Sequence, residues 1–164
     1  MNTKEALSAV LKSTQQMVGW YLGDLSDADI LIRPVPAANH IAWQLGHLID
    51  SERKLTMSQI PGSVYPELPA GWSDQHGKTT ASMDPPKGFA SKAEYVSLFN
   101  KVREASLAAL AKIPDADLDK PVTGPMAQYV STLGNLFVMH GNHVMMHAGQ
   151  FTVVRRKLGK PVLF

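Results

Sequence analysis

The C-terminal quarter of the chain contains the segment His140-Gly-Asn-His143-Val-Met-Met-His147-Ala-Gly149-Gln150. His143 and His147 are four residues apart, so on a helix they lie one turn apart on the same face. The surrounding residues are largely apolar, which predicts that this face is buried. Two imidazoles in a core are costly unless their ring nitrogens are satisfied, and a shared metal ion would satisfy them. The segment therefore predicts a helix that contributes two metal ligands.

A helical wheel of this segment places Gln150 on the same face as the two histidines. With His143 at zero, His147 falls at about 40° and Gln150 at about −20°. His140 is near this face but about 10 Å along the axis from His147, too far for both to hold one ion. Two pairings remain open, His143 with His147 or His140 with His143. Gln150 favours the first, because it can orient a ligand or contact a bound group.

Four long segments of the chain carry the 3.6-residue apolar period of amphipathic helices. The segments are 3–21, 39–60, 91–113 and 132–158. We expect Asn39 and Ser91 as N-caps and Gly159 as the C-cap of the last helix. None of the segments alternates as a strand does, and the links between them are too long for simple hairpins. The sequence predicts an all-α four-helix bundle with long inter-helix connections.

Residues 61–90 are the least regular part of the sequence, with five prolines and four glycines. A stretch of this length without secondary structure is unusual in a compact domain, so we expect it to be functional or partly helical. It contains His76, which we expect to be a solvated loop residue.

The second predicted helix offers a partner for the histidine pair. Trp43, His47 and Ser51 are spaced by four and share one stripe of this helix. Gly46 lowers helix stability by about 1 kcal/mol relative to alanine, which close packing or metal access would explain. His40 is expected in the first turn, near solvent.

A single metal site made of His47, His143 and His147 follows from these two helices. The chain has no cysteine, so a metal must be held by imidazole and oxygen ligands. Three neutral imidazoles leave at least one coordination position open for water or substrate, which is typical of catalytic sites. Lys54, seven residues after His47, is a candidate for holding anionic groups of a cofactor.

The composition places the chain among globular proteins and excludes several functions. Its 164 residues fit one domain, 1–164, and 45% of them are hydrophobic. With a net charge of +2 and no basic stripe, we expect no nucleic-acid partner. Four cations between residues 155 and 160 are expected to complement the dipole of the last helix. No signal peptide or membrane span is visible, so we expect a cytoplasmic protein.

Three sequence patterns occur together in this chain. They are Asn39-His-Ile-Ala-Trp43-Gln-Leu-Gly46-His47-Leu, His143-x-x-x-His147-x-Gly149-Gln150 and Arg155-Arg156-x-Leu158-Gly159-x-Pro161. In this order they resemble the DinB-like (DNA-damage-inducible) superfamily of bacterial four-helix bundles. The resemblance extends over the whole chain in helix order and length, and the second pattern is its most specific part.

This resemblance implies a site and a range of activities. It implies that His47, His143 and His147 bind a divalent ion such as nickel, zinc or iron. Some relatives transfer low-molecular-weight thiols (mycothiol or bacillithiol), others isomerise maleylpyruvate with a thiol cofactor, and some are described as hydrolases. Relatives are often dimers, so we expect a homodimer. The resemblance does not imply DNA binding.

We therefore expect a divalent-metal-dependent enzyme that acts on a small molecule, with a thiol-cofactor-dependent transferase as the first hypothesis. Because the chain has no cysteine, the nucleophilic thiol would come from the cofactor. Lys54 or residues 61–90 would hold its anionic groups, and Gln150 would contact it. A metal-dependent hydrolase is the second hypothesis. Asp50 and Glu52, the carboxylates nearest His47 in sequence, lie about 60° and about 140° from it on the wheel, and neither is a persuasive general base. A non-catalytic bundle that binds a metal or small ligand is the third.

Overall fold

The computed structural model describes residues 1–83 and 86–163; Asp84, Pro85 and Phe164 lie outside the described part. Its helices are α1 (Thr3–Leu22), α2 (Ile41–Gln59), α3 (Trp72–Gln75), α4 (Lys92–Lys112) and α5 (Leu133–Lys157). Short 3-10 turns occupy Asp29–Leu31, Asp115–Asp119 and Gly124–Gln128. The described residues form no strand, and the predicted all-α bundle with its four long helices is confirmed. Within these residues, no helix combines the length and apolarity needed to cross a membrane.

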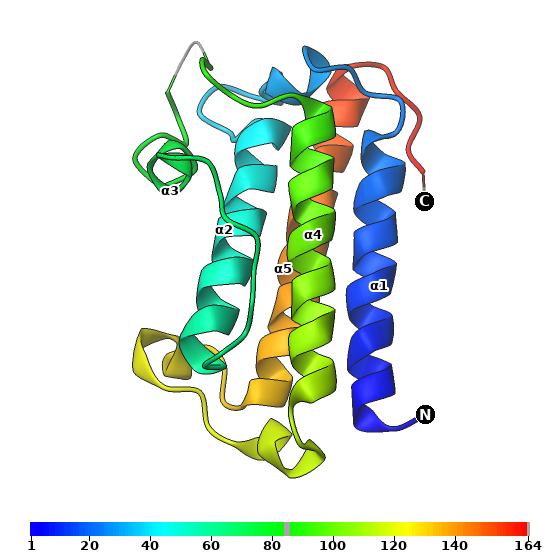
Figure 1. The fold of residues 1–164 in the computed structure, drawn as a ribbon. Coiled ribbons are helices and arrows are strands. Elements are labelled where there is room, and N and C mark those ends of the chain that lie inside the picture. The colour runs from blue at the N-terminus through cyan, green and yellow to red at the C-terminus, as the bar shows by residue number, and fades with distance from the viewer. Residues whose placement is uncertain (84–85, 164) are drawn as a thin grey trace.

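The four long helices do not alternate in direction along the chain (Figure 1). α1 packs against α4 and α5, and α2 also packs against α4 and α5. Figure 1 shows that the link after α2 returns along the whole bundle before α4 begins, so α2 and α4 run in the same direction. α5 runs opposite to α2. The facing surfaces of α2 and α5 are therefore antiparallel neighbours, although residues 60–132 separate them in the sequence.

Local capping interactions explain where the helices begin and end. Ser91 forms the expected capping box with Glu94, whose backbone and side chain both contact it. The left-handed φ of Gly159, +68°, ends α5. The amide of Gly159 donates to Arg156 O, and that of Lys160 donates to Arg155 O. These two bonds form a Schellman motif, which explains the glycine at this position.

The start of α2 differs from the expectation by one residue. The N-cap is His40, whose Nδ1 accepts from the Trp43 amide at 3.1 Å, and not Asn39. The carbonyl of Asn39 instead accepts from the side chain of Gln44. His40 is also fully buried and contacts the Phe89 ring edge-on, so its expected position near solvent is wrong. An imidazole that caps a helix can be buried because a backbone donor satisfies its acceptor nitrogen.

The cations at the end of α5 bind local groups of the chain. Arg155 is fully buried and pairs with Asp24, and it also donates to Tyr21 O at 2.8 Å. Lys157 and Lys160 each donate to a backbone carbonyl at 2.8 Å. These contacts agree with the structural interpretation of this cluster rather than with a basic binding patch.

A buried ion pair connects three helices near the centre of the bundle. Arg103 of α4 donates from Nη2 to Glu52 Oε2 of α2 at 2.9 Å, and both side chains are almost fully buried. Ser106 donates to the other Glu52 oxygen at 2.6 Å. Arg103 Nη1 donates to Thr14 of α1 at 3.2 Å. Burial raises the pKa of the Glu52 carboxyl, and the Arg103 guanidinium opposes this shift.

We expect Arg103→Met to reduce the free energy of unfolding by about 3–5 kcal/mol, because it leaves the Glu52 carboxylate buried without its partner. The double variant Glu52→Leu/Arg103→Met should lose clearly less, since it leaves no buried charge. Urea unfolding followed by circular dichroism measures both values, with the exposed Arg156→Met as the matched control. A double variant that is less stable than Arg103→Met would contradict this account.

Candidate functional site

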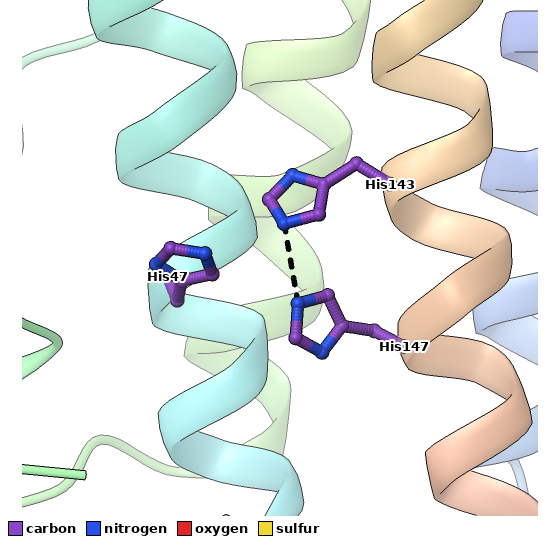
Figure 2. A group of neighbouring side chains, drawn as sticks. All are labelled: His47, His143 and His147. Carbon is purple, nitrogen blue, oxygen red and sulfur yellow. Dashed lines mark hydrogen bonds between the residues drawn. The ribbon is translucent and has the colours of Figure 1, made fainter. Parts of the chain in front are cut away.

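Three histidines from two helices converge in the middle of the bundle (Figure 2). His47 comes from α2, and His143 and His147 come from consecutive turns of α5. One ring nitrogen from each of them lies within 4.8 Å of the others, and the Nε2 atoms of His143 and His147 are 3.2 Å apart. Figure 2 shows the two α5 rings extending toward α2, where His47 lies. The structure thus brings together the three side chains that the sequence singles out.

His140 takes no part in this group. It is buried, and its Nε2 lies 2.9 Å from the Thr56 hydroxyl. The sequence left open a pairing of His140 with His143. The structure instead groups His143 with His47 and His147.

A glutamine that the sequence analysis did not single out orients His147. Gln44 donates from Nε2 to Asn39 O at 2.8 Å, so its amide oxygen faces the other way. That oxygen accepts from His147 Nδ1 at 2.8 Å. Because an amide oxygen only accepts, Nδ1 carries the proton and Nε2 has a free lone pair. The signal was present in the sequence, since Gln44 precedes His47 by three residues and shares its helix face.

Trp43 holds the ring of His47. The two rings are stacked, with centroids 5.1 Å apart and an angle of 8° between their planes. The Trp43 indole donates to Gly77 O at 3.2 Å, in the segment that follows α3. His47 is therefore placed by a tryptophan that is itself anchored to a second element.

The missing side chain of Gly46 makes room for His76. A Cβ atom on Gly46 would lie 2.0 Å from His76 Cδ2, so even alanine would displace this ring. The ring nitrogens of His76 lie 2.8 Å from Trp72 O and from the Tyr95 hydroxyl. His76 is almost completely buried, and the expectation of a solvated loop residue is wrong. Residues 61–90 are partly helical, through α3, and this helix carries His76 into the core.

The imidazoles of the group are held in the neutral form. Burial, together with the neighbouring histidines, lowers the pKa of His147 to about 3 and that of His143 to about 4. Burial also lowers the pKa of His47. Because metal ions bind the neutral imidazole, these shifts keep the ligand form populated near neutral pH.

A large open cavity of about 1090 Å³ lies beside the histidines. Its walls come from α2, α5, the segment 126–131 and Lys78. They consist of His47, Asp50, Ser51, Lys54, Leu55, Lys78, Met126, Tyr129, Val130, Ser131, Asn135, Val138, Met139, Asn142, His143 and Met146. Lys54 thus lies where the sequence analysis expected a cofactor. Gln150 is exposed and is not among the described residues of this wall, but its side chain hydrogen-bonds to His147.

The two carboxylates nearest His47 in sequence are already engaged. Asp50 accepts from Lys54 at 2.7 Å and from Ser73 at 2.9 Å. Glu52 is paired with Arg103 in the core. Asp50 is nevertheless part of the cavity wall, whereas Glu52 is not among the residues of that wall.

Comparison with known proteins places the chain in a family. Residues 11–151 match the DinB superfamily. The chain belongs to this superfamily. No curated protein matches the sequence.

Two solved structures share the fold of this DinB-superfamily chain. A conserved protein from Enterococcus faecalis superposes with a TM-score of 0.72 at 16% identity, over 98% of this chain and 99% of that one. YfiT from Bacillus subtilis superposes with a TM-score of 0.67 at 17% identity, over 96% of this chain and 89% of that one. YfiT is described as a probable metal-dependent hydrolase with an unusual four-helix bundle topology. At these identities the two structures show the fold.

The burial of His140 predicts a specific pH dependence of stability. Burial lowers its pKa to about 3, and Arg103 adds to this shift, while an unfolded histidine titrates near 6.5. Between these values the unfolded chain binds a proton that the folded chain does not bind. The free energy of unfolding should therefore fall as the pH drops below about 6.5, by about 1.4 kcal/mol per pH unit for this group.

Urea unfolding of the chelator-treated protein between pH 7 and 4.5 measures this dependence. His140→Asn should flatten the slope by about one proton, whatever its own effect on stability. An unchanged slope in the variant would show that His140 is protonated in the folded protein.

Proposed function

We propose that this chain binds a divalent metal ion through His47, His143 and His147 and acts on a small molecule that enters the adjacent cavity. The observation that carries this proposal is the convergence of three neutral imidazoles, two of which, His47 and His143, line the cavity. Three such side chains, two of them in one buried helix face, are costly to desolvate unless a ligand uses their lone pairs.

The geometry of the histidines fits such an ion. Ligand nitrogens at about 2.0–2.1 Å from one tetrahedral ion lie about 3.3 Å apart, close to the 3.2 Å between the Nε2 atoms of His143 and His147. The hydrogen bond from His147 Nδ1 to Gln44 presents Nε2 to this position, as outer hydrogen bonds do for most metal-ligating histidines. Imidazole ligands suit nickel, zinc and iron.

The reaction that these surroundings favour is transfer of an external thiol to an electrophile. A divalent ion held here supplies Lewis acidity, which lowers the pKa of a thiol or of water. Asp50 and Glu52 both bind other side chains, so no carboxylate of this pair is free to act as a strong general base. A thiol with a lowered pKa needs less help from such a base than water does. Lys54 and Gln150 are proposed to contact the thiol cofactor, Lys54 while it stays paired with Asp50.

Metal-dependent hydrolysis is the second candidate, and the position of Asp50 supports it. Asp50 is part of the cavity wall and close enough to His47 to raise its pKa in opposition to burial. Loss of its contact with Lys54 would free one carboxylate oxygen to accept a proton. The description of YfiT as a probable metal-dependent hydrolase points in the same direction for this fold.

The oligomeric state and location of the protein stay predictions. On α4, the apolar residues Phe99 and Val102 are buried in the core of the chain, and Leu98 packs against that core. A homodimer therefore has to use other surfaces. Cytoplasmic location agrees with the proposed use of a low-molecular-weight thiol.

Metal analysis of the purified protein tests the three ligands. We expect about one divalent ion per chain in the wild type, and a large loss in His47→Ala, His143→Ala and His147→Ala, because each removes one of three ligands. Gln44→Leu keeps all ligands and should weaken metal binding about 10–100-fold. His140→Asn is the matched control and should retain the ion. Full metal content in any of the three alanine variants would remove that residue from the site.

A thiol-consumption assay tests the reaction. Metal-loaded protein should accelerate the attack of mycothiol, bacillithiol or glutathione on chlorodinitrobenzene, in which a carbon–sulfur bond forms and chloride leaves. Chelation and His143→Ala should abolish the acceleration. Ester hydrolysis without thiol consumption would instead establish the second candidate, and silence in both assays would leave a metal-binding bundle without catalysis.

A further inference from the structure

The cavity beside the histidines carries two lysines that differ in their surroundings. Lys54 of α2 donates to Asp50 Oδ2 at 2.7 Å, an i,i+4 ion pair, and the other Asp50 oxygen accepts from Ser73. The charge of Lys54 is thus already balanced at short range. Lys78 also forms part of the cavity wall, and within the described residues no carboxylate lies within ion-pair distance of it.

The backbone beside Lys78 is tied to the histidine group. Gly77, the preceding residue, accepts from the Trp43 indole at 3.2 Å, and that indole stacks on His47. The Thr80 hydroxyl donates to Gly77 O at 2.8 Å and to Gln75 O at 2.7 Å, which closes the turn. The position of Lys78 along the cavity wall is therefore fixed by the same side chain that holds His47.

Lys78 and the proposed metal ligands His47 and His143 line the same cavity. Among the described residues of the cavity wall the only carboxylate is Asp50, which binds Lys54, so Lys78 has no counter-charge of its own there. An anionic group of a ligand would supply it.

The rest of the wall combines apolar side chains with the polar Ser51, Ser131, Asn135 and Asn142. Six aliphatic or aromatic residues from α5 and the segment 126–130 line it: Met126, Tyr129, Val130, Val138, Met139 and Met146. A ligand whose apolar part covers this surface gains binding free energy from the apolar area that it buries. Its charged group would then lie at Lys78. Methionine side chains adapt to ligands of different shape, so this wall favours a chemical class rather than one exact shape.

We propose that Lys78 is the anion-binding residue of the cavity and that the ligand is an amphiphilic carboxylate, with its carboxylate on Lys78 and its apolar body along α5. This inference rests on the proposed function for the location of the reacting group. The carboxylate belongs either to the thiol or to the electrophile, and both share the same chemistry at Lys78. Lys54, which the sequence favoured for this role, remains paired with Asp50.

Calorimetric titration of zinc-loaded protein with two matched ligand pairs tests the proposal. The first pair is mercaptopropionate and mercaptoethanol, which share a thiol but differ in the carboxylate. The second is phenylbutyrate and phenylbutanol, which have no thiol. We expect the wild type to bind the acid of at least one pair about tenfold more tightly than its neutral partner. Lys78→Gln should remove this preference, and Lys78→Arg should retain it.

Two further variants separate the alternatives. Lys54→Gln tests the competing assignment and should keep the preference, and the exposed Lys12→Gln of α1 is a control for the loss of one positive charge. A preference that persists in Lys78→Gln, or its absence from both pairs in the wild type, would overturn the proposal. If the wild type prefers phenylbutyrate to phenylbutanol but binds neither mercaptopropionate nor mercaptoethanol, the result would support the role of Lys78 and count against thiol transfer. If the metal content did not depend on the three histidines, this would count against the proposed function but not against the role of Lys78.

Discussion

The buried pair of Glu52 and Arg103 fixes the position of α2, which carries His47, relative to α4. Sliding α2 by one helical turn relative to α4 would move Glu52 by about 5.4 Å and leave two charges in the core without partners. The same shift would carry His47 away from the α5 histidines. Hydrophobic packing between these helices tolerates several registers, whereas a buried ion pair with hydrogen bonds to Ser106 and Thr14 is satisfied in one. The ion pair thereby fixes the height of His47 in the bundle.

A second constraint acts on the imidazoles themselves. Burial keeps them neutral, which suits ligand binding, but a neutral imidazole can present either nitrogen. Gln44 resolves this ambiguity for His147, and it can do so because its own amide is held by the carbonyl of Asn39 at the start of α2. The helix terminus, the glutamine and the ligand therefore form one chain of hydrogen bonds. The displacement of the N-cap to His40 is part of this arrangement, since it leaves the Asn39 carbonyl available.

Features with a period along the chain could be predicted, and features that depend on contacts between distant segments could not. The i,i+4 spacing of His143 and His147 and the stripe that contains His47 are local, so helix geometry alone brought them to facing surfaces. His40 and His76 were misplaced because their burial depends on Phe89 and Tyr95, residues that no periodicity links to them, and on α3, a short helix that the sequence did not delimit. Gly46 gave the only local sign of such a contact, a glycine inside a helix, without identifying the ring that fills the space.

The segment that follows α3 connects positioning with recognition. Its backbone at Gly77 anchors the tryptophan that stacks on His47, and its next residue, Lys78, contributes to the cavity wall. A ligand that draws Lys78 toward an anionic group would act on the same turn that holds Trp43, so binding and the placement of His47 are mechanically linked. The sequence cost of this linkage is visible in α2, where Gly46 replaces a better helix former so that His76 can bring the segment this close. In the proposed complex the crossover would therefore supply the anion-binding residue, while α2, α5 and the segment 126–131 supply the rest of the cavity wall.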